Sequence, residues 1–385
     1  MIKEKFNCLD IETTLLGLGV MRLPADENLK VDEEYGINLI RYAIDQGVNY
    51  IDTGYTYHGG KSEVIIGKAL KDGYREKVVI ADKLPIWLAK TEEDVDRFFN
   101  EQLERLGQAD GGCIDMYLIH NIIPANWKKT QKLNVLPYLE QKKAEGKLGH
   151  IGFSFHGDLK LFKEVIDAYP WEFCQIQLNY LDKNIQAGLE GLAYARERGV
   201  DVIIMEPLKG GRLTDKVPAS VQTIWDDAKA GGAIEQSRTP AKTAFKWVAA
   251  QEGVKLILSG MGNRQQLDEN IAIFSDENLK TLGEVEQIAI DKVADEYNRL
   301  IPYQCTGCEY CLPCEKKLNI PDVIDYLNNW YAFGQNPSTK IEYTTWIAEG
   351  HHGSDCIACG KCEKKCPQSL PIMEIMKTAA KEFGV

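Results

Sequence analysis

Four polar residues in the first third of the chain are of types that can move a proton. Asp52 and Tyr57 lie five positions apart, and Lys83 and His120 follow. A buried carboxylate is costly unless a cation pairs with it, and Lys83 is the candidate cation. A lysine beside a phenol lowers the phenol's pKa from its reference of about 10, so Tyr57 would become a general acid near neutral pH. His120 would donate a hydrogen bond to a carbonyl oxygen.

Each of these residues alone also has a non-catalytic explanation. Asp52 and Lys83 would form a structural salt bridge. His120 would be a histidine of the core, and Tyr57 would line a pocket. Tyr55, two residues earlier, competes with Tyr57 for the role of proton donor. If all four residues lie at one place, a reactive site explains them better than these separate explanations do.

Cysteines are concentrated near the end of the chain. Eight of the eleven form two runs: Cys305, Cys308, Cys311 and Cys314, then Cys356, Cys359, Cys362 and Cys366. The second run, followed by Pro367, has the C-x₂-C-x₂-C-x₃-C-P spacing of bacterial ferredoxins, which bind [4Fe–4S] clusters. The first run departs from this spacing, because its last gap is two residues long and Glu315 replaces the proline.

Eight cysteines are enough for two [4Fe–4S] clusters. In ferredoxins with two clusters, the fourth cysteine of each run ligates the other cluster. By this rule one cluster takes Cys305, Cys308, Cys311 and Cys366, and the other takes Cys314, Cys356, Cys359 and Cys362. The alternative is a pair of structural zinc sites with four cysteines each.

Short apolar segments alternate with amphipathic ones ahead of this region. Eight segments are predicted strands: residues 15–21, 48–52, 78–83, 114–120, 150–154, 173–178, 201–206 and 255–260. Helical patterns lie between them, at 35–45, 91–105, 130–145, 158–168 and 185–198, and another begins at Pro240. Strands buried on both faces and separated by helices form a parallel sheet. Eight such units predict a (β/α)₈ barrel.

A doubly wound open sheet is the alternative architecture. It usually carries a glycine-rich turn between its first strand and a helix. Here the stretch Leu16-Gly-Leu-Gly runs on past Pro24 into a polar loop, so its glycines do not open a helix. In a barrel, the C-terminal ends of the strands share one face. Asp52, Lys83 and His120 end the second, third and fourth predicted strands, so the barrel would bring them together.

The composition is that of a globular protein. The 385 residues are 44% hydrophobic and 26% charged, with a formal net charge of −12. An acidic chain is not expected to bind nucleic acid or an anionic membrane surface. No apolar stretch reaches the roughly 18 residues of a transmembrane helix, and the first residues lack the apolar core of a signal peptide. We therefore expect a cytoplasmic protein with no nucleic-acid or membrane partner.

These residues and their surroundings resemble the aldo-keto reductase superfamily over about residues 10–275. The shared motifs are Gly17-Leu-Gly-Val-Met-Arg22, Asp52-Thr-Gly-Tyr-Thr-Tyr57, Ser62-Glu-Val-Ile-Ile-Gly67, Asp115-Met-Tyr-Leu-Ile-His120, Gly152-Phe-Ser154, Glu206-Pro-Leu-Lys-Gly-Gly-Arg-Leu213 and Gln266-Leu-Asp-Glu-Asn270, with Lys83 and Gln175. The resemblance implies a (β/α)₈ barrel with an NAD(P)H-dependent carbonyl reductase site. The catalytic residues that it implies are Asp52, Tyr57, Lys83 and His120. It also makes Tyr57, not Tyr55, the acid.

The resemblance also implies contacts with a nicotinamide cofactor. They are Gly19, Met21, Asp52, Ser154, Gln175, Glu206, Leu208, Gly211, Leu213, Met261, Arg264 and Asn270. By the family's pattern, Ser154 and Gln175 hold the nicotinamide carboxamide, and residues 208–213 cross the pyrophosphate. Arg264 falls where an adenosine phosphate is bound, which favours NADP(H) over NAD(H). Glu206 departs from the pattern, since many members place an aromatic ring there.

The cysteine-rich region is similar to the α-helical ferredoxin domains with two clusters. The chain as a whole resembles the branch of the superfamily that carries such a domain. We expect the barrel at residues 1–275, a connecting helix at 276–300, and a small, mostly α-helical ferredoxin-like domain at 301–385. The expected reaction is the reversible reduction of a small aldehyde or ketone to an alcohol.

A second class of function also fits the sequence. An iron–sulfur protein for electron transfer or redox sensing would use the barrel to bind a nucleotide or a flavin, and would exchange electrons with a ferredoxin-type partner. A hydride carries two electrons, whereas a cluster passes one at a time. A barrel with its own NAD(P)H therefore needs no cluster. The two hypotheses differ in whether a carbonyl compound is turned over.

Overall fold

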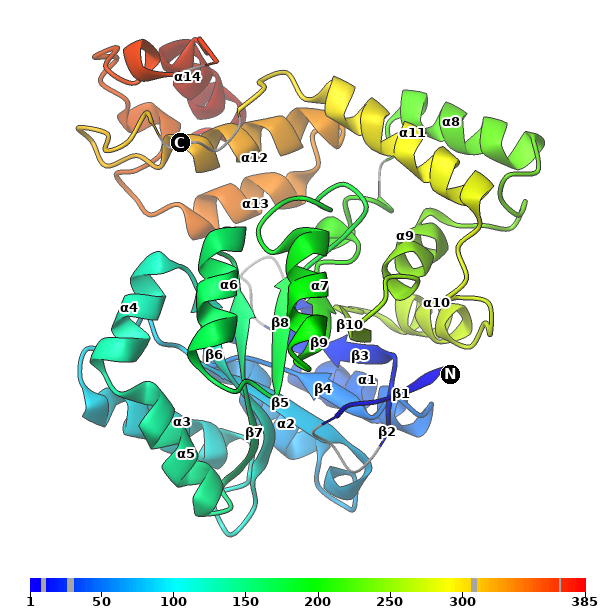
Figure 1. Cartoon of the computed structure of the whole chain (residues 1–385), viewed down its shortest axis with the longest axis vertical. Coiled ribbons are helices and arrows are strands. Elements are labelled where there is room, and N and C mark those ends of the chain that lie inside the picture. The colour runs from blue at the N-terminus through cyan, green and yellow to red at the C-terminus, as the bar shows by residue number, and fades with distance from the viewer. Residues whose placement is uncertain (8–11, 26–30, 216, 306–309, 367) are drawn as a thin grey trace. The chain divides into compact units, whose positions relative to one another are not determined.

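The computed structural model describes residues 1–385 except 8–11, 26–30, 216, 306–309 and 367 (Figure 1). The described chain forms two compact units. The first contains Met1–Lys209 and Ala241–Leu282, and the second contains Gly210–Pro240 and Gly283–Val385. Each unit is therefore assembled from two stretches that are separated in the sequence.

The first unit is a closed barrel of parallel strands, as predicted. The strands hydrogen-bond to one another in the order β10-β3-β4-β5-β6-β7-β8-β9. They are β3 (Leu16–Gly19), β4 (Tyr50–Asp52), β5 (Val79–Leu84), β6 (Ile114–Ile122), β7 (Leu148–Phe155), β8 (Phe173–Gln177), β9 (Asp201–Met205) and β10 (Val254–Ser259). An antiparallel pair, β1 (Lys3–Lys5) with β2 (Glu12–Thr14), precedes the barrel. Its mostly polar residues explain why the hydrophobic pattern does not predict it.

Helices alternate with the barrel strands along the chain. They are α1 (Glu33–Asp45), α2 (Lys61–Ala69), α3 (Glu92–Arg105), α4 (Pro124–Lys132), α5 (Val135–Ala144), α6 (Leu159–Ala168), α7 (Gly188–Glu197), α9 (Pro240–Ala249) and α10 (Arg264–Phe274). Thr91 and Asp94 form the capping box that starts α3, within the helix predicted at 91–105. The single helix predicted at 130–145 is instead two helices, because Asn134 takes a left-handed conformation with a φ of 47°.

Alternation along the strands determines what faces the barrel interior. Val79 and Ala81 on β5 are buried in the same apolar cluster as Met116 and Leu118 on β6. Because successive side chains of a strand point to opposite faces, the next inward positions lie two residues further on. Those positions are at the C-terminal ends of the strands, where parallel barrels carry their chemistry.

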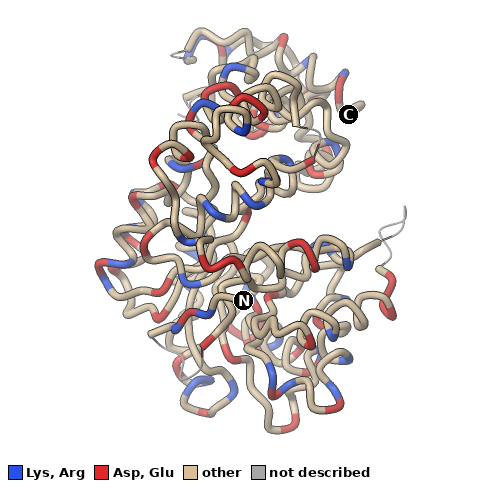
Figure 2. Tube along the Cα trace, turned by 90° about the vertical axis from the view of Figure 1, so that its right-hand side faces the viewer, with Lys and Arg blue, Asp and Glu red and all other residues tan. Residues whose placement is uncertain are grey.

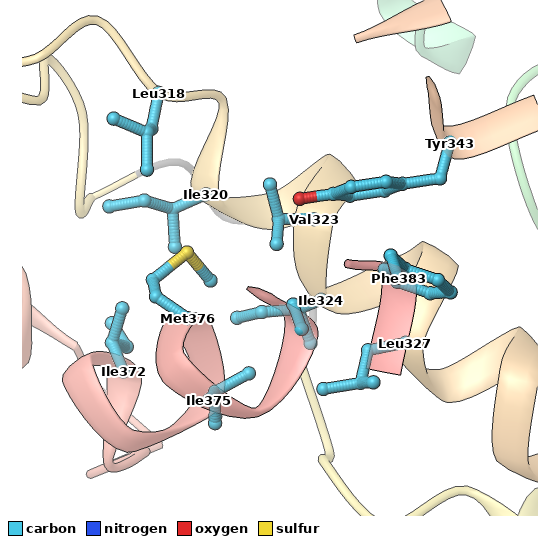
Figure 3. Close-up of a cluster of buried hydrophobic side chains, with 11 residues drawn as sticks. Leu318, Ile320, Val323, Ile324, Leu327, Tyr343, Ile372, Ile375, Met376 and Phe383 are labelled. Carbon is cyan, nitrogen blue, oxygen red and sulfur yellow. The ribbon is translucent and has the colours of Figure 1, made fainter. Parts of the chain in front are cut away.

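The second unit is helical. Its helices are α8 (Ala219–Ala230), α11 (Glu284–Leu300), α12 (Ile320–Ala332), α13 (Pro337–Trp346) and α14 (Ile372–Phe383). Helices α12, α13 and α14 contribute most of a buried apolar cluster (Figure 3): Leu318, Ile320, Val323, Ile324, Leu327, Tyr343, Ile372, Ile375, Met376, Ala379 and Phe383. Helix α8 packs against α11. The long connection after β9 thus supplies a helix to this unit, not to the barrel.

Two further features concern the whole chain. Acidic and basic residues are interspersed along the trace of each unit (Figure 2). The excess of acidic residues is thus spread over the chain rather than gathered in one segment. Within the described ranges, no helix has both the length and the apolar character needed to cross a membrane.

Arg212 joins the two stretches of the second unit. Its guanidinium pairs with Glu342 on α13 and donates to Thr339 Oγ1 at 3.3 Å, and its side chain is 8% exposed. We expect Arg212→Ala to lower the free energy of unfolding of this unit by roughly 2 kcal/mol, because a partly buried carboxylate loses its cation. Denaturant unfolding followed by circular dichroism would measure this change. Lys377→Ala, which removes an exposed pair with Glu374, should leave the transition unchanged, and equal effects would contradict the prediction.

Candidate functional site

Three strands bring polar and charged groups together at one end of the barrel. Asp52 is the last residue of β4 and pairs with Ala81 on β5. Lys83 lies two residues beyond Ala81 and therefore on the same, inward face of β5. His120 stands in the same relation to the inward Leu118 of β6. The alternation that fills the barrel with apolar side chains thus presents these three groups at its end.

Lys83 and Asp52 form a buried ion pair. Lys83 Nζ lies 2.5 Å from Asp52 Oδ1, and the two residues are 1% and 4% exposed. Lys83 also donates to the backbone carbonyl oxygen of Thr53 at 2.5 Å, and Gln175 Nε2 donates to Asp52 Oδ2 at 3.0 Å. Burial lowers the pKa of Lys83, but Asp52 and Tyr57 raise it by more, so the ammonium stays charged.

The ring of Tyr57 lies close to this pair. Lys83 Nζ is 5.1 Å from the centroid of the ring, and the centroid of the His120 ring is 5.8 Å from it. Gly54 permits this approach, since a Cβ atom there would lie 3.1 Å from Tyr57 Cζ and 3.3 Å from His120 Cε1. A larger residue at position 54 would have to displace the phenol or the imidazole. The four predicted catalytic residues therefore do lie together.

The pKa of Tyr57 differs from the prediction. Burial raises the pKa of the phenol, and Lys83 lowers it by a smaller amount, so the pKa lies above its ordinary value of 10.0. The contribution of Lys83 has the predicted sign. The expected net decrease is nevertheless wrong, because removing water from around the phenolate outweighs one ammonium. Tyr57 therefore stays protonated at neutral pH.

His120 is a neutral imidazole with an unsatisfied nitrogen. Burial lowers the pKa of its ring well below 6.5, and the charges of Lys83 and His156 lower it further. Its Nδ1 atom is buried and has no hydrogen-bond partner among the described residues. The ring of Trp87 lies 5.0 Å away, centroid to centroid. A buried polar atom without a partner costs about 1–3 kcal/mol, so its presence here fits a site that binds a polar ligand atom.

Asp82, the neighbour of Lys83, points to the opposite face of β5. Its Oδ1 accepts the backbone N–H of Lys83 at 2.8 Å, and its Oδ2 is buried with no partner in the described part of the chain. Burial raises the pKa of Asp82 well above its ordinary value, and Glu63 raises it further. Glu63 is itself fully buried and accepts from Arg105 at 2.9 Å and from Gln102 at 3.1 Å. Asp82 therefore holds a proton where a free aspartate would not.

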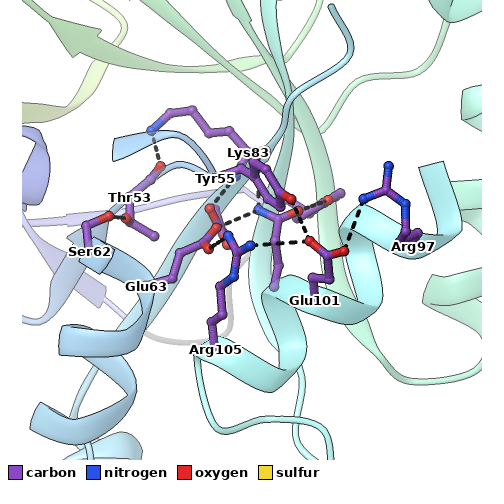
Figure 4. A network of polar contacts seen from close by, with 11 residues as sticks. Thr53, Tyr55, Ser62, Glu63, Lys83, Arg97, Glu101 and Arg105 are labelled. Carbon is purple, nitrogen blue, oxygen red and sulfur yellow. Dashed lines mark hydrogen bonds and ion pairs between the residues drawn. The ribbon is translucent and has the colours of Figure 1, made fainter. Parts of the chain in front are cut away.

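The same network engages Tyr55. Figure 4 shows Tyr55 beside Glu101 and Arg105 on the inner side of α3. The Tyr55 hydroxyl donates to Glu101 at 2.5 Å, and the Arg105 guanidinium lies 4.3 Å from the centroid of its ring. The two competing tyrosines thus have different surroundings, since Tyr57 faces the ammonium of Lys83.

Several residues predicted to contact a nicotinamide cofactor lie beside the tetrad. Gly19, the last residue of β3, pairs with Asp52, and Gln175 donates to Asp52. Ser154 on β7 pairs with Gln175 on β8, and its Oγ accepts the backbone N–H of Asn121 at 2.8 Å. The sequence motif did not reveal the contact between Gln175 and Asp52, because it joins opposite sides of the barrel.

Other predicted cofactor positions lie on neighbouring strand ends. Met21 follows β3 and is 39% exposed, whereas Met261 follows β10 and is buried. Asn270 Nδ2 on α10 donates to Ser259 Oγ, at the end of β10, at 2.9 Å. Arg264 begins α10, and its guanidinium lies 3.9 Å from the centroid of the Tyr42 ring. Arg264 is therefore already stacked on an aromatic side chain.

The last predicted cofactor positions follow β9. Glu206 has a φ of 56°, and one of its carboxylate oxygens lies 3.8 Å from Arg22. Leu208 belongs to the barrel unit, whereas Gly211 and Leu213 belong to the second unit. Glu206 and Leu208 thus belong to the same unit as the tetrad, whereas Gly211 and Leu213 belong to the helical unit.

Five of the predicted cysteine ligands line one cavity in the second unit, of about 320 Å³. They are Cys311, Cys314, Cys356, Cys359 and Cys362. Cys305 and Cys366 pack against the apolar cluster of α12 and α14. Cys308 lies outside the described residues.

The cavity fits a polynuclear cluster better than a single ion. In a tetrahedral zinc site each sulfur lies about 2.3 Å from the metal, which leaves no room between the ligands. A volume of about 320 Å³ corresponds to roughly ten water molecules. Thiolates around a partly apolar cavity are the setting of iron–sulfur clusters.

The protonation of Asp82 predicts how the stability of the chain depends on pH. Because its pKa is raised in the folded chain, its contribution is present at low pH and is lost as pH rises from about 4 through the raised value. Asp82→Asn removes this loss. The melting temperature of the variant, relative to that of wild type, should therefore increase as pH rises from 4.5 to 8. Asp167→Asn is the control. Tyr194 and Arg198 lower the pKa of that exposed aspartate, so the melting temperature of this variant should not rise relative to wild type as pH increases. A constant difference between wild type and Asp82→Asn would contradict the prediction.

Comparison with known proteins places this geometry in a family. The family model described as "Aldo/keto reductase family" matches residues 15–287, and one described as "4Fe-4S dicluster domain" matches residues 304–370. The chain is similar to an Arabidopsis thaliana protein named L-galactose dehydrogenase, with 28% identity over 276 residues, which cover 67% of this chain and 85% of that one. An Escherichia coli (strain K12) protein named NADH-specific methylglyoxal reductase is 28% identical over 311 residues, covering 71% and 93%.

A solved structure shows the same fold. It is the aldo-keto reductase AKR11C1 from Bacillus halodurans (holo form), with a TM-score of 0.60 and 22% sequence identity, covering 76% of this chain and 96% of that one. The family match spans well over half of the chain, and the barrel agrees with it. The chain therefore belongs to the aldo/keto reductase family of NAD(P)H-dependent oxidoreductases and carries a 4Fe–4S dicluster domain in its C-terminal region.

Proposed function

We propose that this chain catalyses the reversible reduction of a small aldehyde or ketone to an alcohol, with Tyr57 as the proton donor. The observation that carries the proposal is the buried pair of Lys83 and Asp52, with 2.5 Å between Nζ and Oδ1, close to the ring of Tyr57. A fixed ammonium beside a phenol favours proton transfer from it, because the ammonium stabilises the phenolate that remains.

Each residue of the tetrad has a separate role in this proposal. His120, as a neutral imidazole, donates a hydrogen bond to the carbonyl oxygen and orients it. Tyr57 gives its proton to the same oxygen, and Lys83 stabilises the resulting phenolate. Asp52 keeps Lys83 charged and in place. NAD(P)H, when bound, supplies the hydride that reaches the carbonyl carbon.

For the cofactor we propose NADP(H) over NAD(H). Arg264, at the first position of α10, supports this choice because it falls where the family binds an adenosine phosphate. Its stacking on Tyr42 does not oppose the role, since arginine can stack on a ring and donate to a phosphate from its edge. The name of the Escherichia coli relative specifies NADH, so both nucleotides need to be compared.

We propose two [4Fe–4S] clusters for the C-terminal cysteines, with Cys314 among the ligands of the second run and Cys366 among those of the first. Cys314 lines the same cavity as Cys356, Cys359 and Cys362, which supports its place with the second run, and Cys311, assigned to the other cluster, lines that cavity as well. Clusters, when bound, pass single electrons, so a ferredoxin-type protein is the proposed electron partner. A flavin would be needed only if those electrons were to form a hydride.

The proposed domains follow the order of the sequence: a barrel at 1–275, a connecting helix at 276–300 and a ferredoxin-like domain at 301–385. The helix of the connecting segment begins at Glu284, and residues 210–240 join the C-terminal helices in one compact unit. We propose a cytoplasmic location, where a reducing environment keeps clustered thiols free of disulfides.

Tyr57→Phe tests the reductase mechanism. We expect it to lower kcat/KM at least 100-fold, about the contribution of a general acid, because the phenolic proton is gone. Oxidation of NADPH and of NADH would be followed against a panel of small aldehydes and ketones. Tyr55→Phe is the matched control and should remain close to wild type. The mechanism fails if no carbonyl is turned over or if Tyr57→Phe is as fast as wild type, and the electron-transfer hypothesis would then be preferred.

Metal analysis tests the clusters. After anaerobic purification we expect about eight iron and eight sulfide per chain, the content of two [4Fe–4S] clusters. Cys314→Ala should lower both counts toward about four, because it removes one ligand of one cluster. Cys113→Ala, which alters a cysteine outside both runs, should keep the full content. Zinc in place of iron, or an unchanged iron count in Cys314→Ala, would refute the assignment.

A further inference from the structure

A polar cluster outside the tetrad holds the turn that follows β9. Glu206 and Lys209 both have a left-handed backbone, with φ of 56° and 49°, although neither is glycine. Such conformations cost on the order of 1–3 kcal/mol each and persist where the surrounding structure fixes them. Two side chains from the segment after β8, Asn179 and Asp182, make contacts that fix this turn.

The contacts reach both strained residues. Lys209 Nζ lies 2.9 Å from Asp182 Oδ1 and 2.8 Å from Oδ2. Asn179 Nδ2 donates to the carbonyl oxygen of Glu206 at 3.2 Å and to Asp182 Oδ2 at 2.9 Å. Gln177 Nε2 donates to the same Asp182 oxygen at 2.8 Å. Burial raises the pKa of Asp182, but Lys209 and the two amides lower it by more, so the carboxylate stays charged.

The position of this cluster in the fold explains why the turn needs an anchor. In a (β/α)₈ barrel, each strand is normally followed by a helix that packs on the barrel, and this limits the turn between them. The first helix after β9 is α8, which belongs to the second unit and packs against α11 (Figure 1), and the helix of this strand in the barrel unit, α9, begins only at Pro240. Lys209 is the last residue before the chain leaves the barrel unit. Asn179 and Asp182, 0% and 4% exposed, hold the turn from the segment that follows β8 instead.

We propose that Asp182 and Asn179 are positioning residues that preorganise the turn at 206–209 for the pyrophosphate of the nicotinamide cofactor. This inference rests on the proposed function, which assigns the pyrophosphate to residues 208–213. A loop that already has its binding conformation loses little free energy to ordering when the ligand arrives. If the competent conformation becomes less populated, the apparent Kd rises by the same factor.

Nucleotide binding to the full-length protein tests the proposal. Asp182→Asn keeps the shape of the side chain and removes its charge, so we expect Kd to rise about tenfold if the competent turn falls to about a tenth of the population. Titration with NADPH and with NADH, followed by quenching of tryptophan fluorescence, should give the same factor for both, because both carry the pyrophosphate. Lys209→Met breaks the same pair from its other side and should raise Kd similarly.

Two comparisons decide between positioning and mere stabilisation. Asp167→Asn removes an exposed pair with Arg198 in the same unit and should leave both Kd values unchanged. If Asp182→Asn and Lys209→Met lower the melting temperature but bind both nucleotides like wild type, the proposal is overturned. Should Asp182→Asn fail to fold, the Kd of Asn179→Ser decides, because Asn179 lies outside residues 208–213 and bonds to the carbonyl oxygen of Glu206.

This experiment also separates the proposal from the function it rests on. The titrations contain no carbonyl compound, so an absence of turnover would not affect them. Wild type that binds neither nucleotide would overturn the proposed function and this proposal together. Wild type that binds both, with variants that bind equally well, would overturn only the role of Asp182.

Discussion

The buried ion pair of Asp52 and Lys83 constrains everything around it. Separating the two charges would leave each without compensation in a medium of low dielectric constant, at a cost of several kcal/mol. The carbonyl of Thr53 and the amide of Gln175 complete the hydrogen bonding of the pair. The exclusion of water that strengthens the pair also keeps Tyr57 protonated and contributes to keeping His120 neutral. One physical condition thus gives a proton donor and a neutral hydrogen-bond donor.

Lys83 is held through its backbone as well as its side chain. Its N–H donates to Asp82, and its carbonyl oxygen accepts from Gln102 at 3.1 Å. Gln102 in turn bonds to the buried Glu63. Strand β5 therefore carries an ionisable group on each face, the ammonium of Lys83 inside the barrel and the protonated carboxyl group of Asp82 beneath the helices. The ion pair on the inner face and the hydrogen bonds to the Lys83 backbone on the outer face fix the strand between them.

Sequence periodicity predicted much of the barrel, because strands and helices alternate with clear apolar patterns. It also predicted that Asp52, Lys83 and His120 would meet, since the ends of parallel strands share one face. The net pKa of Tyr57 could not be predicted, because it depends on side chains from several strands that exclude water. The place of α8 could not be predicted either, since an amphipathic pattern does not identify the partner that covers its apolar face. The contact of Asp182 with Lys209 joins residues 27 positions apart and leaves no local signal.

The discontinuous second unit has a consequence for synthesis on the ribosome. The chain is synthesised from its N-terminus, so α8 is complete before the barrel closes through the pairing of β10 with β3. Val221 and Trp225 of α8 are buried in the folded chain, and its partner helix α11 is made only later. A nascent chain therefore carries an amphipathic helix without its partner during the time in which the barrel forms. The C-terminal part thus packs on a helix that was synthesised well before it. A chain that ends before this part keeps an exposed apolar surface, which is prone to aggregation.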